Sequence, residues 1–227
     1  GWFWAWQGVF EQLAPRYRLL VWDYRGFHGS GLPPGGGPIR IEDHCRDLEC
    51  LMAAEQISSA VLVGWSVGVQ VVLEHYRRRP ETVEALALVN GAQGRVLSRS
   101  MDGRLAALLL PPLLRGLQRL VPAANLALLP LLRQLARSPL SVAALARLGL
   151  VSGQPASIHV ALQSVLTLDY ARYIELGFGA EQHDADDVLE SIRVPTLVTA
   201  GDRDILTRPR LARAVAARIP GARYFEI

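Results

Sequence analysis

A serine lies between two glycines where an apolar run meets a helical pattern. The segment reads Val-Leu-Val-Gly-Trp-Ser-Val-Gly-Val over residues 61–69, so Gly64 and Gly68 flank Ser66. A sharp strand-to-helix turn would strain the backbone of this serine and expose its hydroxyl, and the two glycines remove Cβ atoms that would collide there. This arrangement predicts nucleophilic attack by Ser66, with the backbone N–H of Val67 stabilising an oxyanion. The alternative is an ordinary turn in which the serine is incidental.

Ser66 needs a base, because a serine hydroxyl is a weak nucleophile until its proton is removed. The five candidates in the chain are His28, His44, His75, His159 and His183. His28 follows an apolar run, and we interpret it as a pocket-rim or loop-packing residue that is also an alternative candidate for the base. The other four fall in predicted helices or in a helical insertion, where a packed or solvated role is expected. Their spacing suggests no metal site, so no metal is expected.

Five apolar runs have the length and composition of buried parallel strands. They cover residues 17–23, 60–65, 84–90, 194–200 and 222–227. Helical patterns alternate with them at residues 41–55, 66–79 and 208–219. This repetition predicts an α/β fold with a doubly wound, mostly parallel sheet, whose ligands bind at the carboxyl ends of the strands.

The alternation stops between Ala92 and Ile192. The intervening stretch is rich in leucine, carries arginines at helical intervals and is divided by prolines into short helices. We therefore predict core residues at 1–92 and 192–227, with a helical cap or lid inserted at 93–191. The insertion can pack against the core and also form a wall of an apolar pocket. A helix lying on a membrane surface is the remaining alternative.

Two further motifs accompany the Ser66 turn. Residues 23–31 read Asp-Tyr-Arg-Gly-Phe-His-Gly-Ser-Gly, which is similar to a D-x-R-G-x-G-x-S loop with one additional residue. Residues 194–209 combine a strand, a G-x-x-D motif and a proline. With Gly-Trp-Ser-Val-Gly, these motifs resemble the α/β-hydrolase fold superfamily, in its cap-bearing esterase and haloperoxidase-like branch. The resemblance runs from about residue 6 to residue 227 and contributes least in the insertion.

The resemblance implies a serine hydrolase that cleaves an ester or related acyl bond of an apolar small molecule, through an acyl-enzyme and without a cofactor. Ser66 matches the nucleophile, and Val67 the oxyanion donor. Asp204 matches the acid that orients a histidine, although a turn aspartate is the alternative reading. Trp65, next to the nucleophile, and His28 are expected in the substrate pocket.

The catalytic histidine of the family follows its last strand, and the present sequence ends in that run, at Ile227. The His-Gly pair that carries the second oxyanion donor of the family would similarly precede Gly1. We therefore interpret the sequence as truncated at both ends and expect the histidine beyond Ile227. Two alternatives stay open: a cofactor-free haloperoxidase, C–C hydrolase or lyase-type reaction on the same fold, and a noncatalytic binding protein without the base.

Composition argues against several other classes of protein. All 24 basic residues are arginines scattered among 21 acidic residues, and the net charge is only +3, so no nucleic-acid partner is expected. Two prolines interrupt the longest apolar run, at 105–114, which argues against stable membrane insertion, and a cytoplasmic location is expected. Cys45 and Cys50 indicate no disulfide framework, and we expect both to be half-buried in a helix. Nothing in the sequence favours a particular oligomeric state.

Overall fold

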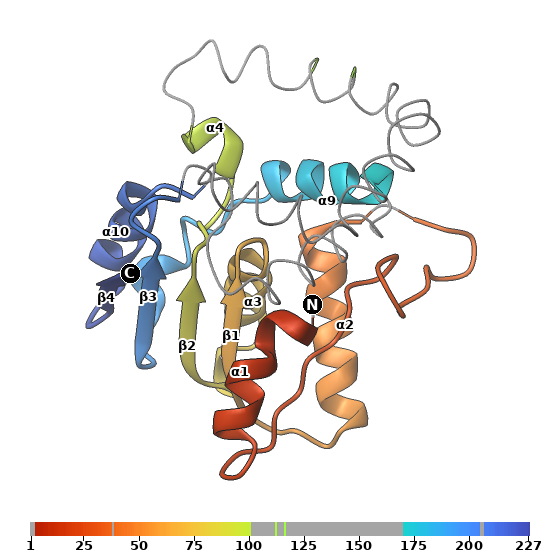
Figure 1. The fold of residues 1–227 in the computed structure, drawn as a ribbon, viewed down its shortest axis with the longest axis horizontal. Coiled ribbons are helices and arrows are strands. Elements are labelled where there is room, and N and C mark those ends of the chain that lie inside the picture. Colours follow the sequence, from red (N-terminus) through yellow and green to blue (C-terminus); the bar gives the residue numbers. More distant parts are fainter. Residues whose placement is uncertain (1–2, 38, 101–111, 113–115, 117–169, 205–206) are drawn as a thin grey trace, which may run out of the picture. The chain divides into compact units, whose positions relative to one another are not determined.

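The computed structural model describes residues 3–37, 39–100, 112, 116, 170–204 and 207–227 (Figure 1). The chain divides into two compact units. The first, here called the N-terminal unit, comprises residues 1–37 and 115–173, and the second, the sheet unit, comprises residues 38–114 and 174–227. Most of the predicted cap at 93–191 lies outside the described residues, so its boundaries stay a prediction.

The N-terminal unit begins with helix α1 (Phe3–Leu13) and continues into a compact loop at residues 23–31. Ser30 Oγ donates a hydrogen bond to Asp23 O at 2.8 Å, and Gly26 N donates to Ser30 O at 3.1 Å. The strand predicted at 17–23 is wrong, because residues 18–24 adopt no strand structure. A strand exists only as part of a hydrogen-bonded ladder, and an apolar run does not by itself supply the partner.

The sheet unit contains four parallel strands in the spatial order β1-β2-β3-β4. Their bounds are Ala60–Trp65 for β1, Val83–Val89 for β2, Thr196–Ala200 for β3 and Arg223–Glu226 for β4. These bounds confirm the other four predicted strands to within two residues. The predicted parallel α/β sheet is therefore confirmed.

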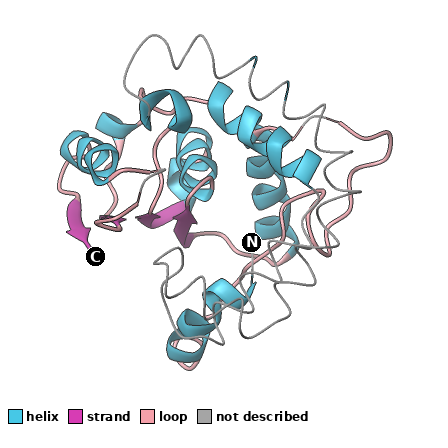
Figure 2. Cartoon of the chain, turned by 45° about the horizontal axis from the view of Figure 1, so that its top comes forward, coloured by secondary structure: helices cyan, strands magenta, loops and turns pink. Residues whose placement is uncertain are grey.

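Three helices of the sheet unit lie where helical patterns predicted them. They are α2 (Ile41–Ala54), α3 (Gly68–Arg78) and α10 (Pro209–Arg218). Helix α3 contacts β1 and β2, α10 contacts β3 and β4, and α2 contacts α3. The β1-α3-β2 and β3-α10-β4 crossovers run in the same direction across the sheet, so their common right-handedness places α3 and α10 over one face, as Figure 2 shows.

The remaining described elements are short or belong to the predicted insertion. They are α4 (Val96–Ser100), α9 (Tyr170–Gln182) and the 3-10 helices η1 (Pro80–Thr82) and η2 (Leu189–Ser191). Among the described helices, none combines the length and the apolar character needed to cross a bilayer.

The two faces of the sheet differ in burial. The strand register puts Leu62, Leu86 and Val198 on the face beneath the helices, where each is at most 6% exposed. The alternate positions form the opposite face and, besides Trp65 at the end of β1, include four exposed apolar side chains: Val61, Val63, Leu197 and Phe225. We call these four residues the exposed apolar row. The hydrophobic core of the unit therefore lies between the sheet and helices α3 and α10.

The two cysteines lie in α2 but differ in environment: Cys45 is buried and Cys50 is exposed. Five residues turn a helix by about 140° beyond one full turn, so the two thiols point in different directions. The expectation that both are half-buried is therefore wrong.

Candidate active site

Ser66 occupies the turn between β1 and α3, with its backbone in the left-handed region at a φ of 55°. Non-glycine residues rarely adopt this conformation, which costs on the order of 1–3 kcal/mol. The turn is held in place because Ser66 N donates to Val89 O at 2.9 Å and Val69 N donates to Ser66 O at 3.1 Å. The residue is exposed. The predicted strained turn with an accessible serine is therefore present.

Two glycines allow the backbone to close tightly around Ser66. A Cβ atom on Gly64 would lie 2.5 Å from Gly68 O, and one on Gly91 would lie 2.5 Å from Ser66 O. Both contacts are with backbone atoms, which cannot swing aside as a flexible side chain can. Gly64 was expected from the sequence pattern, whereas Gly91, from the segment after β2, was not.

Val67 directly precedes α3, at a φ of −56° and a ψ of −29°. The first N–H groups of a helix have no partner within the helix and carry its positive dipole end. Within the described part of the chain, the N–H of Val67 donates to no backbone carbonyl, whereas its own carbonyl accepts from Gln70 N at 3.0 Å. This N–H is therefore available to stabilise negative charge beside Ser66.

Asp204 follows β3, and its carboxylate is held by groups from two segments. Oδ1 accepts a hydrogen bond from Thr207 N at 2.8 Å. Oδ2 lies 2.7 Å from Thr207 Oγ1 and accepts from Asn90 Nδ2 at 3.2 Å. The contacts with Thr207 are what a simple turn aspartate would make, but the contact with Asn90 links Asp204 to the end of β2. Asp202, two residues earlier, is exposed, and among the described residues its carboxylate is paired only with its neighbour Arg203, at 3.8 Å.

Ser66, Asn90 and Asp204 follow three adjacent strands, β1, β2 and β3, and therefore share the carboxyl edge of the sheet. Two strand spacings of about 4.8 Å separate the strands that precede Ser66 and Asp204. An imidazole ring with a hydrogen bond at each nitrogen spans roughly 8 Å. The separation of the two strands is therefore of the same order as the span of an imidazole between a serine and a carboxylate.

Trp65 is the last residue of β1 and is 39% exposed. Side chains alternate between the two faces along a strand, so Trp65 lies on the same face as Val61 and Val63 of the exposed apolar row. His28 is exposed in the loop of the N-terminal unit, with a φ of 47°. The substrate-pocket roles of Trp65 and His28 stay predictions.

The histidines of the sheet unit are all buried away from Ser66 or bonded to other residues. His44 is buried in α2, and His75 Nε2 lies 2.9 Å from Thr82 Oγ1 at the other end of α3. His183 is also buried, with Nδ1 3.1 Å from Gln70 Oε1 and Nε2 3.1 Å from Glu74 Oε2. Within the described part of the chain, none of these three rings is hydrogen-bonded to Ser66. His159 lies outside the described residues.

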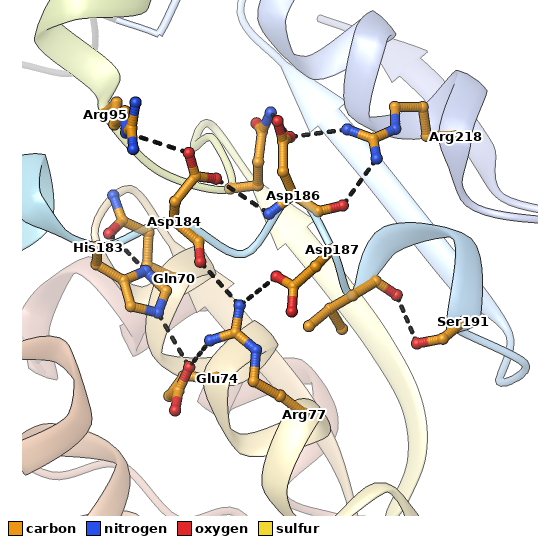
Figure 3. Close-up of polar contacts among 12 residues, drawn as sticks. Gln70, Glu74, Arg77, Arg95, His183, Asp184, Asp186, Asp187, Ser191 and Arg218 are labelled. Carbon is orange, nitrogen blue, oxygen red and sulfur yellow. Dashed lines mark hydrogen bonds and ion pairs between the residues drawn. The ribbon is translucent and has the colours of Figure 1, made fainter.

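His183 belongs to a polar network that fastens residues 183–187 to α3 (Figure 3). Arg77 donates to Glu74, to Asp184 O at 2.8 Å and to Asp187. Burial alone would raise the pKa of Glu74, but hydrogen bonds from His183 and Arg77 outweigh it and hold this pKa below its ordinary value. This network could not be predicted from the sequence, because His183 and its partners on α3 are more than a hundred residues apart along the chain.

The network continues on the other side of this segment. Arg218 NH1 donates to Asp186 Oδ1 at 2.8 Å, and Gln93 Nε2 donates to the same oxygen at 2.7 Å (Figure 3). Burial would raise the pKa of Asp186, but the contacts with Arg99, Gln93 and Arg218 lower it. The segment before η2 is therefore anchored to both α3 and α10.

Comparisons with known proteins identify the family of this chain. The model of the alpha/beta hydrolase fold family matches residues 1–227. The chain belongs to the alpha/beta hydrolase family. A protein of Azorhizobium caulinodans named "Putative carbamate hydrolase RutD" is 29% identical over 225 residues, which cover 98% of this chain and 77% of the relative. Hydrolase activity is the function that this family membership supports.

Two solved alpha/beta hydrolases have the same fold as this chain. A thermophilic esterase from Thermogutta terrifontis matches with a TM-score of 0.73 and 21% identity, over 98% of this chain and 75% of the esterase. The enol-lactonase from Burkholderia xenovorans LB400 matches with a TM-score of 0.71 and 23% identity, over 98% and 76% respectively. At these identities the comparison establishes the fold, and the choice of substrate has to be argued from the site.

Proposed function

We propose that this alpha/beta hydrolase is a serine hydrolase that cleaves an ester or related acyl bond of an apolar small molecule. The observation that carries the proposal is the exposed Ser66 at a φ of 55° between β1 and α3. A strained backbone is kept where the surrounding structure enforces it, and such positions cluster at functional sites. The helix N-terminus that follows Ser66 adds an electrostatic reason for anionic chemistry at this turn.

The proposed reaction has two halves. Ser66 Oγ attacks the acyl carbonyl while a histidine takes the hydroxyl proton, and the N–H of Val67 stabilises the resulting oxyanion. The tetrahedral intermediate collapses, the histidine returns the proton to the leaving alcohol, and an acyl-enzyme remains. A water molecule activated by the same histidine then attacks the acyl carbon, which releases the acid and restores Ser66. Asp204 orients the histidine and stabilises its charged form.

We further propose that this histidine is carried by residues that follow β4. The backbone supports this position, because Ile227 N donates to Ala200 O at 2.9 Å and Asp202 N donates to Ile227 O at 2.8 Å. These bonds hold Ile227 against the loop that leads to Asp204. Residues after Ile227 would therefore leave the sheet beside the carboxylate that has to orient the ring.

Covalent labelling tests the nucleophile. A fluorophosphonate should label the full-length protein at Ser66, and Ser66→Ala should abolish the labelling. Ser98→Ala, which removes a serine that is hydrogen-bonded to Glu181, is the matched control and should be labelled normally. Equal labelling of wild type and Ser66→Ala would overturn the proposal.

A comparison of truncated and full-length proteins tests the position of the base. Residues 1–227 alone should turn over an activated ester about 10⁴ to 10⁶ times more slowly than the full-length protein, since this is the cost of losing a triad member. Undiminished turnover by residues 1–227 would instead assign the base to one of the histidines within them.

Carbamates are a second candidate class of acyl substrate, because four curated relatives carry the name of a carbamate hydrolase. An attack by Ser66 on a carbamate would give a carbamoyl-enzyme through the same steps. Rates for p-nitrophenyl esters of graded chain length and for the matching p-nitrophenyl carbamates would separate the two classes. Absence of hydrolysis in both series would contradict acyl transfer and favour another reaction of the fold.

A further inference from the structure

Helices α2 and α3 lie side by side (Figure 1) and bring together three side chains that bind metals in other proteins. Cys45 and Glu49 are one turn apart on α2, and His75 lies on α3. One donor atom from each residue lies within 4.8 Å of the donor atoms of the other two. Cys45 and His75 are 0% and 1% exposed, so the cluster is not an incidental group of surface acids.

The hydrogen bonds of His75 determine which of its nitrogens is available. Thr82 Oγ1 lies 2.9 Å from both Arg79 O and His75 Nε2. The carbonyl can only accept, so it takes the single hydroxyl proton of Thr82, and His75 Nε2–H then donates to the hydroxyl oxygen. This assignment leaves a lone pair on Nδ1, which is buried and has no hydrogen-bond partner within the described residues. A buried acceptor without a partner carries a desolvation cost that a ligand would remove.

We propose that Cys45, Glu49 and His75 bind a zinc ion through Sγ, a carboxylate oxygen and Nδ1. A thiolate, an imidazole and a carboxylate together form a donor set that zinc prefers. At a tetrahedral angle, a Zn–S bond of about 2.3 Å and a Zn–O bond of about 2.1 Å place sulfur and oxygen about 3.6 Å apart. Cys45 Sγ and Glu49 Oε1 are 3.7 Å apart, so these two ligands already have nearly the required separation.

Arg78 acts on the site from outside the ligand set. Its Nε and NH2 donate to Glu49 Oε1 and Oε2 at 2.8 and 3.2 Å. These two bonds fix the orientation of the carboxylate, as outer hydrogen bonds do for metal ligands. The guanidinium also offsets one negative charge of the ligands, so the affinity should be lower than that of a cysteine-rich structural site.

The zinc ion would act on the fold rather than on the substrate. His75 lies seven residues after Gly68, where α3 begins beside the Ser66 turn. At 1.5 Å per residue, this separation is about 10 Å along the helix axis. The metal would therefore join α2 to the helix that follows the candidate nucleophile, without contacting the reacting atoms.

Metal binding to the tag-free, full-length protein tests the inference. After removal of metal with a chelator and dialysis against zinc, we expect one zinc ion per chain. Co²⁺ in place of zinc should give the near-ultraviolet charge-transfer band of a thiolate ligand. Cys45→Ala should lose this band and the bound zinc, whereas Cys50→Ala, which changes an exposed cysteine of the same helix, should retain both.

Two further variants keep the test decisive. Thr82→Val removes the hydrogen-bond acceptor of His75 Nε2–H and should weaken zinc binding by about 10-fold, the usual effect of losing an outer partner of a ligating histidine. His75→Gln should lose zinc while its circular dichroism in chelator stays that of the wild type, which would separate ligand loss from unfolding. Failure of the wild-type protein to retain zinc, or unchanged zinc binding in folded Cys45→Ala, would overturn the inference.

Discussion

The backbone conformation of Ser66 lowers the stability of the turn. A φ of 55° strains any residue with a Cβ atom, whereas glycine adopts it freely. Ser66→Ala and Ser66→Gly both remove the hydroxyl, but only the second relieves the strain. We expect Ser66→Gly to be more stable than Ser66→Ala by about 1 kcal/mol, measured by urea unfolding.

The control for this comparison is an unstrained position. Ala53 is exposed in α2, so Ala53→Gly should destabilise by up to about 1 kcal/mol. The sign of the effect should therefore reverse between the two sites. If glycine is the less stable residue at both positions, the Ser66 turn is not strained.

Asp204 and Asn90 make a second prediction at the residue scale. Asp204→Asn should lower kcat for ester hydrolysis by about 10⁴, because the carboxylate that we propose to orient the histidine is lost. The Asn90→Asp, Asp204→Asn double variant should recover part of this loss, since Asn90 Nδ2 and Asp204 Oδ2 are only 3.2 Å apart. Steady-state kinetics of the two variants measure the difference. A double variant no faster than Asp204→Asn would mean that the carboxylate must come from the loop after β3.

At the scale of elements, the network between α3 and residues 183–187 predicts a dependence of stability on pH. The pKa of Glu74 is lower in the folded protein than its ordinary value. The ionised carboxylate therefore stabilises the fold above the unfolded pKa of about 4.3, and this contribution is lost as the pH falls through the folded pKa. Glu74→Gln should be about 2 kcal/mol less stable than the wild type at pH 7. This difference should shrink below about pH 4.

Urea unfolding of both proteins at a series of pH values measures this difference. Glu81→Gln is the matched control, because Glu81 is exposed and its one ion pair within the described residues, with Arg79, is 3.8 Å long. That substitution should change the free energy of unfolding by less than about 0.5 kcal/mol at every pH. A difference between Glu74→Gln and wild type that stays constant with pH would contradict the proposed role of the carboxylate.

Local sequence patterns predicted most of the elements but few of the contacts between them. The strands at 60–65, 84–90, 194–200 and 222–227 were found because buried parallel strands are short, continuous apolar runs. The run at 17–23 has the same character but no strand structure, since the ladder partner that makes a strand is not encoded locally.

In the candidate site, too, local patterns could be predicted but contacts between distant segments could not. The Ser66 turn and Asp204 follow recognisable strands, and the spacing of small and acidic residues identifies them. Thr207 could have been noticed, because it follows Asp204 by three residues before the proline that begins α10. The cluster of Cys45, Glu49 and His75 could not, because its donors come from two helices whose packing only the structure reveals.

At the scale of the whole molecule, the exposed apolar row predicts how residues 1–227 behave in solution. Val63 is 46% exposed and Phe225 is 48% exposed on the same face of the sheet. Val63→Thr and Phe225→Thr preserve strand propensity. We expect them to reduce binding of a hydrophobic dye and self-association, with stability changed by less than about 0.5 kcal/mol.

Dye fluorescence and light scattering after size-exclusion chromatography measure these two effects. Leu88→Thr, on the face buried under the helices, is the control and should be clearly destabilising. A loss of more than about 2 kcal/mol in Val63→Thr or Phe225→Thr would show that the row is buried in the folded protein.

The order of the strands also has a consequence for how the chain folds. Val61 pairs with Ala85, 24 residues later, whereas Leu86 pairs with Thr196, 110 residues later. Closing the longer loop costs about 1 kcal/mol more in chain entropy, and pairings distant in sequence slow folding. During synthesis, the turn that holds Ser66 can form against β2 long before β3 has been made. The backbone turn at Ser66 would therefore form early. Asp204 would come near it only when β3 pairs with β2.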